Sequence, residues 1–266
     1  MDLGYKGKTV IVTGGGSNIG RGISLGFAKE GANLMIGDID TAQAEKVVQE
    51  ANALKGGGKT ITTKCDVTNL DDVQAMYKKA NDEFGQIDVL VNNVGWDDMM
   101  LFTETTPAFW EKILKINYIG ALNNVKTALE YMIPAKKGGA IVCISSDASR
   151  QGEYKEAVYG GAKAAVNGFV KSIARENGRY GIRANVVCPG VTIPSQDEIG
   201  DGSLWKGSDQ FFTPEQIQKI AMAYPLRKIG KASDIANAVL FLGSNEVAGH
   251  ITGQVLSVSG GYSMVG

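Results

Sequence analysis

The chain has 266 residues, of which 44% are hydrophobic and 21% charged, and its formal net charge is -1. That length suffices for one large α/β domain with a substantial core, or for two small domains. A near-neutral charge without a basic block argues against a nucleic-acid partner. The N-terminus lacks the pattern of a signal peptide, and no apolar run approaches the roughly 20 residues of a membrane helix. We therefore expect a cytoplasmic protein with no membrane partner.

Short apolar runs alternate with longer segments of helical spacing along the chain. Strands are expected at 10–13, 33–36, 60–63, 89–91, 140–144, 184–188 and 254–258, and helices at 21–30, 41–54, 71–84, 109–132, 157–179 and 233–242. This alternation is typical of βαβ units, and continuous apolar strands indicate burial on both faces. The predicted fold is a single α/β domain, 1–266, with a doubly wound (Rossmann) seven-stranded parallel sheet and helices on both faces.

A glycine-rich turn, TGGGSNIG at 13–20, follows the first strand and leads into a helix. Backbone N–H groups in such a turn and at the helix start attract a pyrophosphate. Gly14 allows positive φ, and Asn18 tolerates left-handed backbone better than most residues. The dinucleotide spacing G-x-G-x-x-G is absent, because its third glycine would fall on Ile19. The loop alone therefore leaves a flexible turn as the alternative.

Asp38 ends the second strand, near the position where a carboxylate accepts hydrogen bonds from an adenosine ribose. The same carboxylate would repel a 2′-phosphate, and no Arg or Lys occupies positions 37 to 40. NAD is therefore favoured over NADP. The alternative is a helix N-cap before Thr41, a role that Asp38 could share with Asp40.

The third and fourth strands also end in residues that suit a nucleotide. Asp66 with Val67, and Asn93 with Gly95, place an acceptor beside a small or apolar residue, as an adenine edge requires. Each pair alone is more typical of a turn.

Ser146 follows the fifth strand, and Tyr159 and Lys163 share one face of the next helix at i and i+4. A phenol has a pKa of about 10, and a cation one turn away favours the phenolate and lowers that value. The pair would then donate or accept a proton at a carbonyl or alcohol oxygen. Many helices carry Tyr and Lys four residues apart, so the pair alone is not diagnostic.

The cysteines and the histidine predict neither disulfides nor a metal site. Cys65, Cys143 and Cys188 each lie in an apolar run, and their odd number and wide spacing suit reduced core cysteines. His250 is the single histidine and has no Cys or His partner at metal-ligand spacing. We expect no metal.

Together these motifs resemble the short-chain dehydrogenase/reductase family of the single-domain type, from Lys8 to the C-terminal ITGQVLSVSGG. TGGGSNIG is similar to that family's T-G-x-x-x-G-x-G loop, with Asn18 in place of the middle glycine. Val94 stands where the family's N-N-A-G has alanine. The resemblance implies an enzyme that interconverts a secondary alcohol and a ketone with NAD, and the two departures imply a modest change in cofactor affinity.

The resemblance also implies a role for each matching residue. Tyr159 resembles the catalytic acid/base, and Lys163 resembles the residue that lowers its pKa and holds the nicotinamide ribose. Ser146 resembles the residue that hydrogen-bonds the substrate oxygen, and Asn117 the one that bends a helix and anchors a proton-relay water. The cofactor-binding residues implied are Gly14, Ser17, Asn18, Ile19, Gly20, Asp38, Asp66, Val67, Asn93, Gly95, Tyr159, Lys163, Pro189, Gly190, Val191 and Thr192.

The substrate is suggested by a resemblance to one branch of the family, the 2-hydroxycyclohexanecarboxyl-CoA dehydrogenases. The matching stretches are NVGWD at 93–97, SDASR at 146–150, EAVY at 156–159, NVVCPG at 185–190 and GQVLSVSGG at 253–261. They imply a 3-hydroxyacyl-CoA with a cyclic or aromatic acyl part. Neighbouring branches reduce 3-oxoacyl carrier-protein thioesters or act on sugars, steroids and cyclic alcohols, and these stay open.

Trp96, Arg150 and Trp205 are candidate substrate contacts, and 191–224 is expected to close over the substrate as a lid. The alternatives are a packed aromatic for Trp96 and a surface ion pair for Arg150. The resemblance implies a homo-oligomer, since most of the family are tetramers. A catalytically silent NAD-binding subunit or sensor is the alternative class. The intact set of Asn117, Ser146, Tyr159 and Lys163 argues against it.

Overall fold

The computed structural model describes residues 2–54, 56–194, 198–199 and 212–265. Its strands are β1 (Thr9–Thr13), β2 (Asn33–Asp38), β3 (Thr60–Lys64), β4 (Val89–Asn92), β5 (Gly139–Ile144), β6 (Ile182–Pro189) and β7 (Val255–Val258). Its α-helices are α1 (Asn18–Lys29), α2 (Thr41–Ala53), α3 (Leu70–Phe84), α4 (Pro107–Leu114), α5 (Gly120–Ala135), α6 (Ala148–Gln151), α7 (Ala157–Asn177), α8 (Pro214–Ala221), α9 (Ala232–Gly243) and α10 (Asn245–Ala248). Short turns of other helix types are η1 (Phe102–Glu104), η2 (Lys115–Ile119) and η3 (Gly178–Tyr180).

The strands form one seven-stranded sheet in the order β3-β2-β1-β4-β5-β6-β7, and each neighbouring pair is parallel. The order reverses between β1 and β4, which creates the crevice where doubly wound sheets bind ligands. The predicted fold class is confirmed. Each predicted strand overlaps an observed one, and β6 extends the prediction at both ends.

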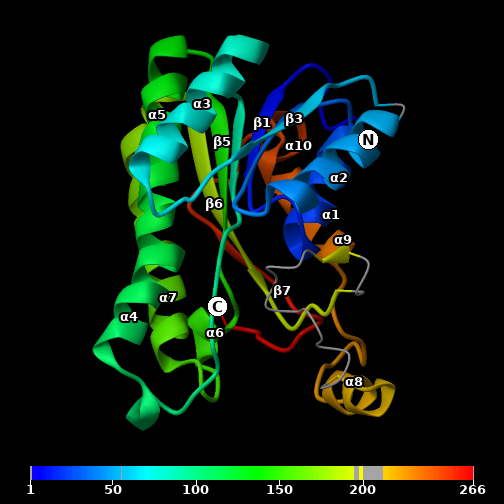
Figure 1. Cartoon of the computed structure of the whole chain (residues 1–266), viewed down its shortest axis with the longest axis vertical. Coiled ribbons are helices and arrows are strands. Elements are labelled where there is room, and N and C mark those ends of the chain that lie inside the picture. The colour runs from blue at the N-terminus through cyan, green and yellow to red at the C-terminus, as the bar shows by residue number, and fades with distance from the viewer. Residues whose placement is uncertain (1, 55, 195–197, 200–211, 266) are drawn as a thin grey trace.

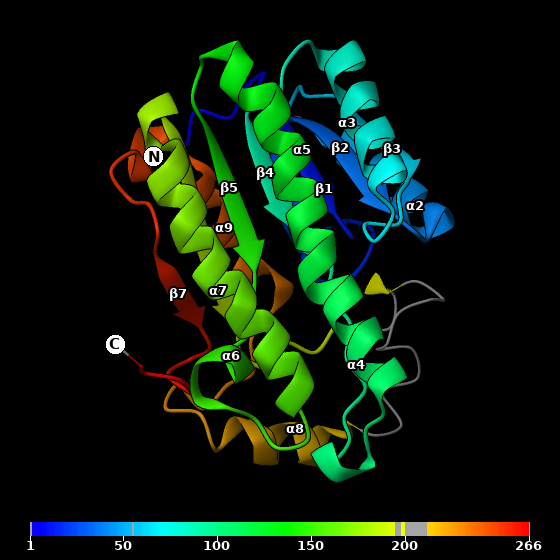
Figure 2. The ribbon, with the colours of Figure 1, turned by 90° about the vertical axis from the view of Figure 1, so that its left-hand side faces the viewer.

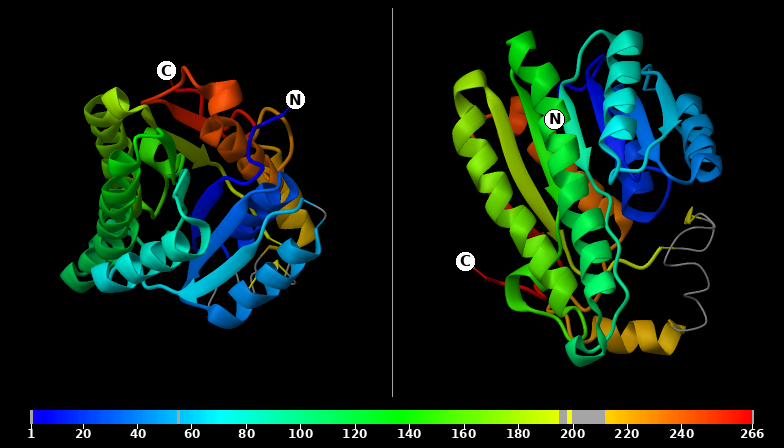
Figure 3. Two further views of the ribbon diagram at one scale, coloured as in Figure 1. Left: turned by 90° about the horizontal axis from the view of Figure 1, so that it is seen from above. Right: turned by 60° about the vertical axis from the view of Figure 1, so that its left-hand side comes forward.

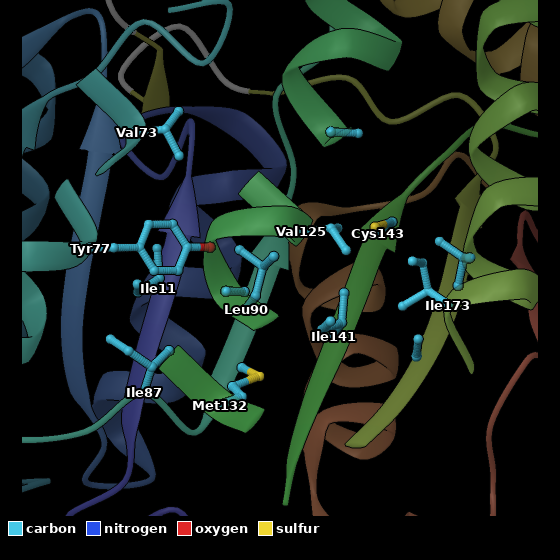
Figure 4. Close-up of a cluster of buried hydrophobic side chains, with 14 of the residues drawn as sticks. Ile11, Val73, Tyr77, Ile87, Leu90, Val125, Met132, Ile141, Cys143 and Ile173 are labelled. Atoms are coloured by element: carbon cyan, nitrogen blue, oxygen red, sulfur yellow. The ribbon is translucent and has the colours of Figure 1, made fainter. Parts of the chain in front are cut away.

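Helices cover both faces of the sheet (Figure 1; Figure 3, left), with α3, α5 and α7 on one side and α1 and α9 on the other. Side chains alternate between the two cores because successive residues of a strand point to opposite faces. In β1, Ile11 joins the first core, while Val10 and Val12 join the second. Figure 4 shows the first core, where Tyr77 of α3 and Met132 of α5 pack over Ile11, Leu90 and Ile141.

All strands point the same way, so their carboxyl ends meet at one edge of the sheet, toward α6 and α8 (Figure 2). Any ligand site of this fold is expected at that edge. The cysteines at 65, 143 and 188 are buried free thiols, as their apolar surroundings predicted. In the described part of the chain, no helix is long and apolar enough to cross a membrane.

The segment 109–132, predicted as one helix, is interrupted. Residues Lys115–Ile119 form a π-helical turn between α4 and α5. The wider turn changes which backbone carbonyls find partners, and such turns concentrate at functional sites. The interruption centres on Asn117, a predicted site residue.

Candidate cofactor and active site

The glycine-rich loop is built for close backbone approach. Gly14 has φ +61°, and its N–H donates to the Gly37 carbonyl at 2.7 Å. The Asn93 side chain donates to the carbonyls of Thr13 and Gly14, both at 3.1 Å. A Cβ at Gly20 would overlap the Gly14 carbonyl oxygen, so only glycine lets helix and loop meet here. Asn93 thus holds the loop, and its amide is already engaged in place of the adenine contact that the sequence suggested.

The start of α1 leaves its N–H groups available to an anion. Ser17 is the N-cap, but its side chain makes no capping hydrogen bond. Asn18 has φ +46°, the left-handed backbone expected of the residue that replaces glycine there. Its side-chain Oδ1 is buried and has no hydrogen-bond partner among the described residues. Free helical N–H groups beside Ile19 and Gly20 fit a pyrophosphate, which carries the opposite charge to the helix start.

Asp38 lies at the carboxyl end of β2 and is 8% exposed. Its carboxylate accepts the Gly16 N–H at 2.9 Å and the Asp40 N–H at 3.0 Å. Burial raises the pKa of Asp38, and these two hydrogen bonds oppose the rise. Asp40, and not Asp38, caps α2 by accepting the Gln43 N–H at 3.0 Å. The capping role is therefore settled, and Asp38 stays beside the glycine loop, where a ribose would lie.

Asp66 and Val67, the residues predicted to lie near an adenine, follow the end of β3. Asp66 accepts the Thr68 N–H at 2.9 Å and is half-buried. Val67 is buried against Gly120 of α5, where a Cβ would lie 2.7 Å from Val67 Cγ2. The side chain of Val94 packs against the first core and lies above Gly14, so the valine narrows the space over the loop.

The nicotinamide side is expected where β6 ends. Pro189, the last residue of β6, pairs with Val258 of β7. The next residue, Gly190, donates its N–H to the Val258 carbonyl at 3.2 Å. The Val191 N–H donates to Tyr224 Oη at 3.3 Å, and Thr192 is buried with its Oγ1 donating to the Gly190 carbonyl at 3.3 Å. The predicted turn is present, and Tyr224 is a contact that the sequence did not suggest.

Asn117 organises the centre of the site. It is 2% exposed, and its Nδ2 donates to the Ile113 carbonyl at 2.9 Å and to the Trp96 carbonyl at 2.7 Å. Its Oδ1 accepts the Trp96 N–H at 3.1 Å. The side chain thus satisfies a carbonyl released by the π-turn and fixes the loop after β4. A Cβ at Gly95 would lie 2.9 Å from Lys163 Nζ and 3.2 Å from Asn117 Oδ1, so these three residues meet.

Ser146, Tyr159 and Lys163 converge at the same edge of the sheet. Ser146 Oγ accepts the Ala148 N–H at 3.1 Å, and the Ser146 hydroxyl is hydrogen-bonded to Tyr159. Lys163 is 2% exposed, and its Nζ donates to the Ile144 carbonyl at 3.1 Å and lies 5.7 Å from the centroid of the Tyr159 ring. The four predicted residues are therefore brought together as a tetrad. The hydroxyls of Ser146 and Tyr159 are hydrogen-bonded, and the buried Lys163 ammonium lies near the Tyr159 ring and Asn117.

The predicted lowering of the Tyr159 pKa is wrong for this structure. Burial raises the pKa of Tyr159 above its ordinary value, and the carboxyls of Glu156 and Asp97 raise it further, against the hydrogen bond from Ser146. Burial also lowers the pKa of Lys163 to about 8, so its charge is itself disfavoured. Desolvation is the largest influence on both groups, and a protonated Tyr159 is the dominant form at neutral pH.

The three candidate substrate residues have different outcomes. The Trp96 ring packs against α4, with its centroid 6.1 Å from that of Phe109 and 3.5 Å from Lys112 Nζ, which supports the packed-aromatic alternative. Trp205 lies outside the described residues. Arg150 donates to the Val255 carbonyl at 3.1 Å, to Ser257 Oγ at 2.9 Å and to the Val265 carbonyl. In the described part of the chain Arg150 forms no ion pair, and its donors hold β7 and the C-terminal tail, so the surface ion-pair alternative is wrong; the substrate contact stays a prediction.

Replacing Arg150 by methionine is expected to lower the free energy of unfolding by roughly 1–3 kcal/mol, because carbonyl acceptors on β7 lose their partner. The KM of a substrate should stay within about threefold of the wild-type value, since the guanidinium is already engaged by β7 and the C-terminal tail. Denaturant unfolding and steady-state kinetics of the same variant check both expectations. A large rise in KM with unchanged stability would return Arg150 to the substrate site.

Two functional candidates were missed by sequence reasoning. Asp97 and Glu156 both act on Tyr159 electrostatically, as its raised pKa shows. Glu156 could have been found, because it precedes Tyr159 by three residues at the start of the same helix. Asp97 carries no comparable spacing signal, since a different strand brings it to the site.

Comparisons with known proteins agree with this geometry. Residues 14–263 match the family described as enoyl-(acyl carrier protein) reductase. An uncharacterised oxidoreductase of Thermotoga maritima is 34% identical over 99% of this chain and 100% of its own length. The 3-oxoacyl-[acyl-carrier-protein] reductase FabG of the same organism is 32% identical over 96% of this chain and 98% of its own. The (2S)-[(R)-hydroxy(phenyl)methyl]succinyl-CoA dehydrogenase subunit BbsD of Thauera aromatica is 33% identical over 98% and 99%.

Proposed function

We propose, since the chain belongs to the short-chain dehydrogenase/reductase family, that it interconverts a secondary alcohol and a ketone by hydride transfer with NAD. The proposed substrate is a 3-hydroxyacyl-CoA with a cyclic or aromatic acyl part. One observation carries the proposal: the Ser146 hydroxyl is hydrogen-bonded to Tyr159, and the buried Lys163 Nζ lies 5.7 Å from the centroid of the Tyr159 ring, next to Asn117 and Gly95. Members of this family bind a nicotinamide cofactor, and the carboxyl edge of the sheet is where one fits.

The roles proposed for the tetrad follow from its protonation. In the reductive direction the protonated Tyr159 donates its proton to the ketone oxygen as that oxygen becomes an alcohol. Ser146 donates a hydrogen bond to the same oxygen and stabilises the charge that develops there. Lys163 provides a cation near the Tyr159 ring, and Asn117 holds the loop after β4 in place through its hydrogen bonds to Trp96. The bound nicotinamide supplies or accepts the hydride.

The protonation of Tyr159 predicts how the rate of each direction depends on pH. Alcohol oxidation requires Tyr159 to accept a proton, and its raised pKa keeps it protonated. Oxidation should therefore accelerate as pH rises, while reduction is already supported near pH 7.

NAD is favoured over NADP by the residues at the end of β2. Asp38 places a carboxylate beside the loop, and the next residue, Ile39, is exposed and carries no charge. Ser17 stands at the N-cap without a basic group. Arg21, in the first turn of α1, is ion-paired with Glu50 and Glu198. Among the described residues, a 2′-phosphate would meet the carboxylate of Asp38, and the nearby cation Arg21 is already paired with two glutamates.

Changing Asp38 to asparagine is expected to lower the ratio of kcat/KM with NAD to kcat/KM with NADP by about 10- to 100-fold. The variant keeps an acceptor for Gly16 but removes the charge that repels a phosphate. The two cofactors are compared on one substrate. Asp40→Asn, which changes a helix cap three residues before Gln43, is the control and should leave the ratio unchanged. An equal ratio in wild type and Asp38→Asn would remove the argument for NAD.

The substrate class rests on the relatives and on the resemblance of the site stretches. FabG and BbsD are named for acyl thioesters, a 3-oxoacyl carrier protein and a substituted succinyl-CoA. The segment 191–224 is proposed as the lid, whose described ends are anchored by the Val191–Tyr224 hydrogen bond and by a bridge between Thr192 and Gly230. A 3-oxoacyl carrier-protein thioester, a sugar, a steroid or a cyclic alcohol is the alternative within the family.

We also propose a cytoplasmic homo-oligomer, a tetramer by analogy with the family. Apolar side chains are exposed on α4, α9 and β7, namely Trp110, Leu114, Phe241 and Leu256. Buried free thiols suit a reducing compartment.

The test is NAD reduction by the purified protein against hydroxyacyl-CoA thioesters, cyclic alcohols, sugars and steroids. Turnover of one thioester class supports the full proposal. Turnover of free alcohols alone keeps the chemistry but removes the thioester. Tight NAD binding without turnover across the panel would favour a silent NAD-binding subunit or sensor.

A further inference from the structure

Two segments from different parts of the chain carry carboxyl groups to Tyr159. The loop after β4 is fixed at Trp96, whose N–H donates to Asn117 Oδ1 and whose carbonyl accepts from Asn117 Nδ2. It is then drawn against the segment before α7, where the Met100 N–H donates to the Lys155 carbonyl at 3.1 Å. Asp97 follows the first anchor, and Glu156 follows the second. The fold thus brings the loop that carries Asp97 against the start of α7, where Glu156 precedes Tyr159 by three residues, and the charges of both acids act on Tyr159.

The fold does not use these two carboxyls fully. Asp97 accepts the Asp98 N–H, but its Oδ2 is buried with no hydrogen-bond partner in the part of the chain that the structure describes. Glu156 is the N-cap of α7, yet its side chain makes no capping hydrogen bond. A buried carboxyl oxygen without a partner is costly, which points to a ligand group that supplies the missing donor.

The charges around the two acids are mostly negative. Burial raises the pKa of Asp97 to about 6 and that of Glu156 to about 7, and each is raised further by neighbouring acids, Asp98 for the first and Asp97 with Glu153 for the second. The cations nearby are engaged or set back: Lys112 lies over the Trp96 ring, Lys155 over the Tyr154 ring, and Lys163 bonds Ile144. A negatively charged substrate group would therefore be repelled by Asp97 and Glu156.

We propose, on the basis of the function proposed above, that Asp97 and Glu156 form an acidic pair that determines substrate specificity beside the reacting carbon. The pair accepts a hydrogen bond from a hydroxyl or amide N–H of the substrate and rejects a substrate that places a carboxylate there. Hydrogen bonds to an ionised acceptor are strong, and like charges at close range are strongly unfavourable. The substrate is thus uncharged at this position and carries a donor.

The test compares three CoA thioesters that differ only at the sixth acyl carbon: 3-hydroxyhexanoyl-CoA, 3,6-dihydroxyhexanoyl-CoA and 3-hydroxyadipyl-CoA. A second matched series without CoA is cyclohexanol, 1,3-cyclohexanediol and 3-hydroxycyclohexanecarboxylate. NAD-linked kcat/KM is measured for wild type, Asp97→Asn, Glu156→Gln and the double variant. Asp98→Asn, which removes an exposed acid next to Asp97, is the matched control.

Wild type should prefer the hydroxyl over the carboxylate form by about 100-fold in whichever series it accepts, and the double variant should lose about 10-fold of that preference. The preference should grow as pH rises through 6 to 7, because both acids ionise in that range. Protonation of Tyr159 cancels in this ratio, since it affects both substrates equally. The double variant should show no such growth.

The outcomes separate this inference from the proposed function. If the thioesters react and the ratio is the same in wild type, double variant and control, the acidic pair is not a specificity determinant. If only the ring alcohols react and the ratio behaves as expected, the pair stands and the thioester assignment falls. If neither series reacts in wild type or variant, both fall.

Discussion

A Tyr159→Phe variant is expected to lose about 10³-fold or more of its kcat/KM, because the ring keeps its packing while the only proposed proton donor disappears. Binding of NAD should change little, since the glycine loop and Asp38 follow β1 and β2 and Tyr159 lies on α7. Alcohol oxidation and ketone reduction should fall together, because the same proton moves in both directions. Steady-state kinetics and NAD titration of the purified variant measure these effects.

Tyr154→Phe is the matched control, because Tyr154 is 70% exposed and lies five residues away. Its kinetics should match the wild type. Activity of Tyr159→Phe within tenfold of wild type would assign the proton transfer to another group, and Glu156 would then be the first candidate.

The second large effect is expected at Lys163, where function and stability oppose each other. Replacement by methionine should lower kcat/KM by about 100-fold or more, because the cation behind Tyr159 is lost. The same change should raise the free energy of unfolding at pH 7 by roughly 1–3 kcal/mol, since a buried charge is replaced by an apolar chain. Loss of the hydrogen bond to the Ile144 carbonyl offsets part of this gain.

The stability gain should depend on pH in a defined direction. The pKa of Lys163 is about 8 in the folded protein and 10.5 as a free side chain. Between these values the unfolded chain holds a proton that the folded protein lacks, so the stability of the wild type rises with pH. The advantage of Lys163→Met should therefore be largest below pH 8 and shrink toward pH 10. Urea unfolding at several pH values measures it.

Lys171→Met, at an exposed position on the same helix, controls for the change of residue type and should show neither effect. A Lys163→Met protein that is less stable than wild type at pH 7 would mean that the ammonium contributes to the fold by more than its burial costs.

The sequence was sufficient for the sheet because the inner strands β1, β4 and β5 are largely apolar and the strands are separated by clear helical periods. The outer strands β3 and β7 are only partly buried, so the expected burial on both faces is wrong for them. Asp38 and Ser146 also reached the predicted edge, since the ends of parallel strands must meet there, whereas Asn117 and Lys163 are brought to it by the helical segments η2 and α7. The interruption at Asn117 was not visible in the hydrophobic pattern, because a π-turn shifts the register by one residue without changing composition. The role of Asn117 in bending a helix came only from the resemblance to a known family.

Features that depend on desolvation or on distant contacts were beyond the sequence. The pKa of Tyr159 is set by its burial and by Asp97 and Glu156, and the spacing to Lys163 contains neither. From the sequence, Arg150 was a candidate substrate contact or a surface ion pair. Only the fold shows that β7 and the C-terminal tail supply its hydrogen-bond acceptors. Asp97 is held in the site because the preceding residue, Trp96, is hydrogen-bonded to Asn117, which lies 21 residues away along the chain.

The most direct test of the account is a label-transfer measurement. The protein is mixed with NAD and 3-hydroxyhexanoyl-CoA that carries deuterium on the carbinol carbon, and the reduced cofactor is analysed by mass spectrometry. The account predicts that the deuterium appears in the reduced nicotinamide with wild type and Tyr154→Phe, and at a rate about 10³-fold lower with Tyr159→Phe. Reduction of NAD without the label, or equal transfer by wild type and Tyr159→Phe, would contradict it.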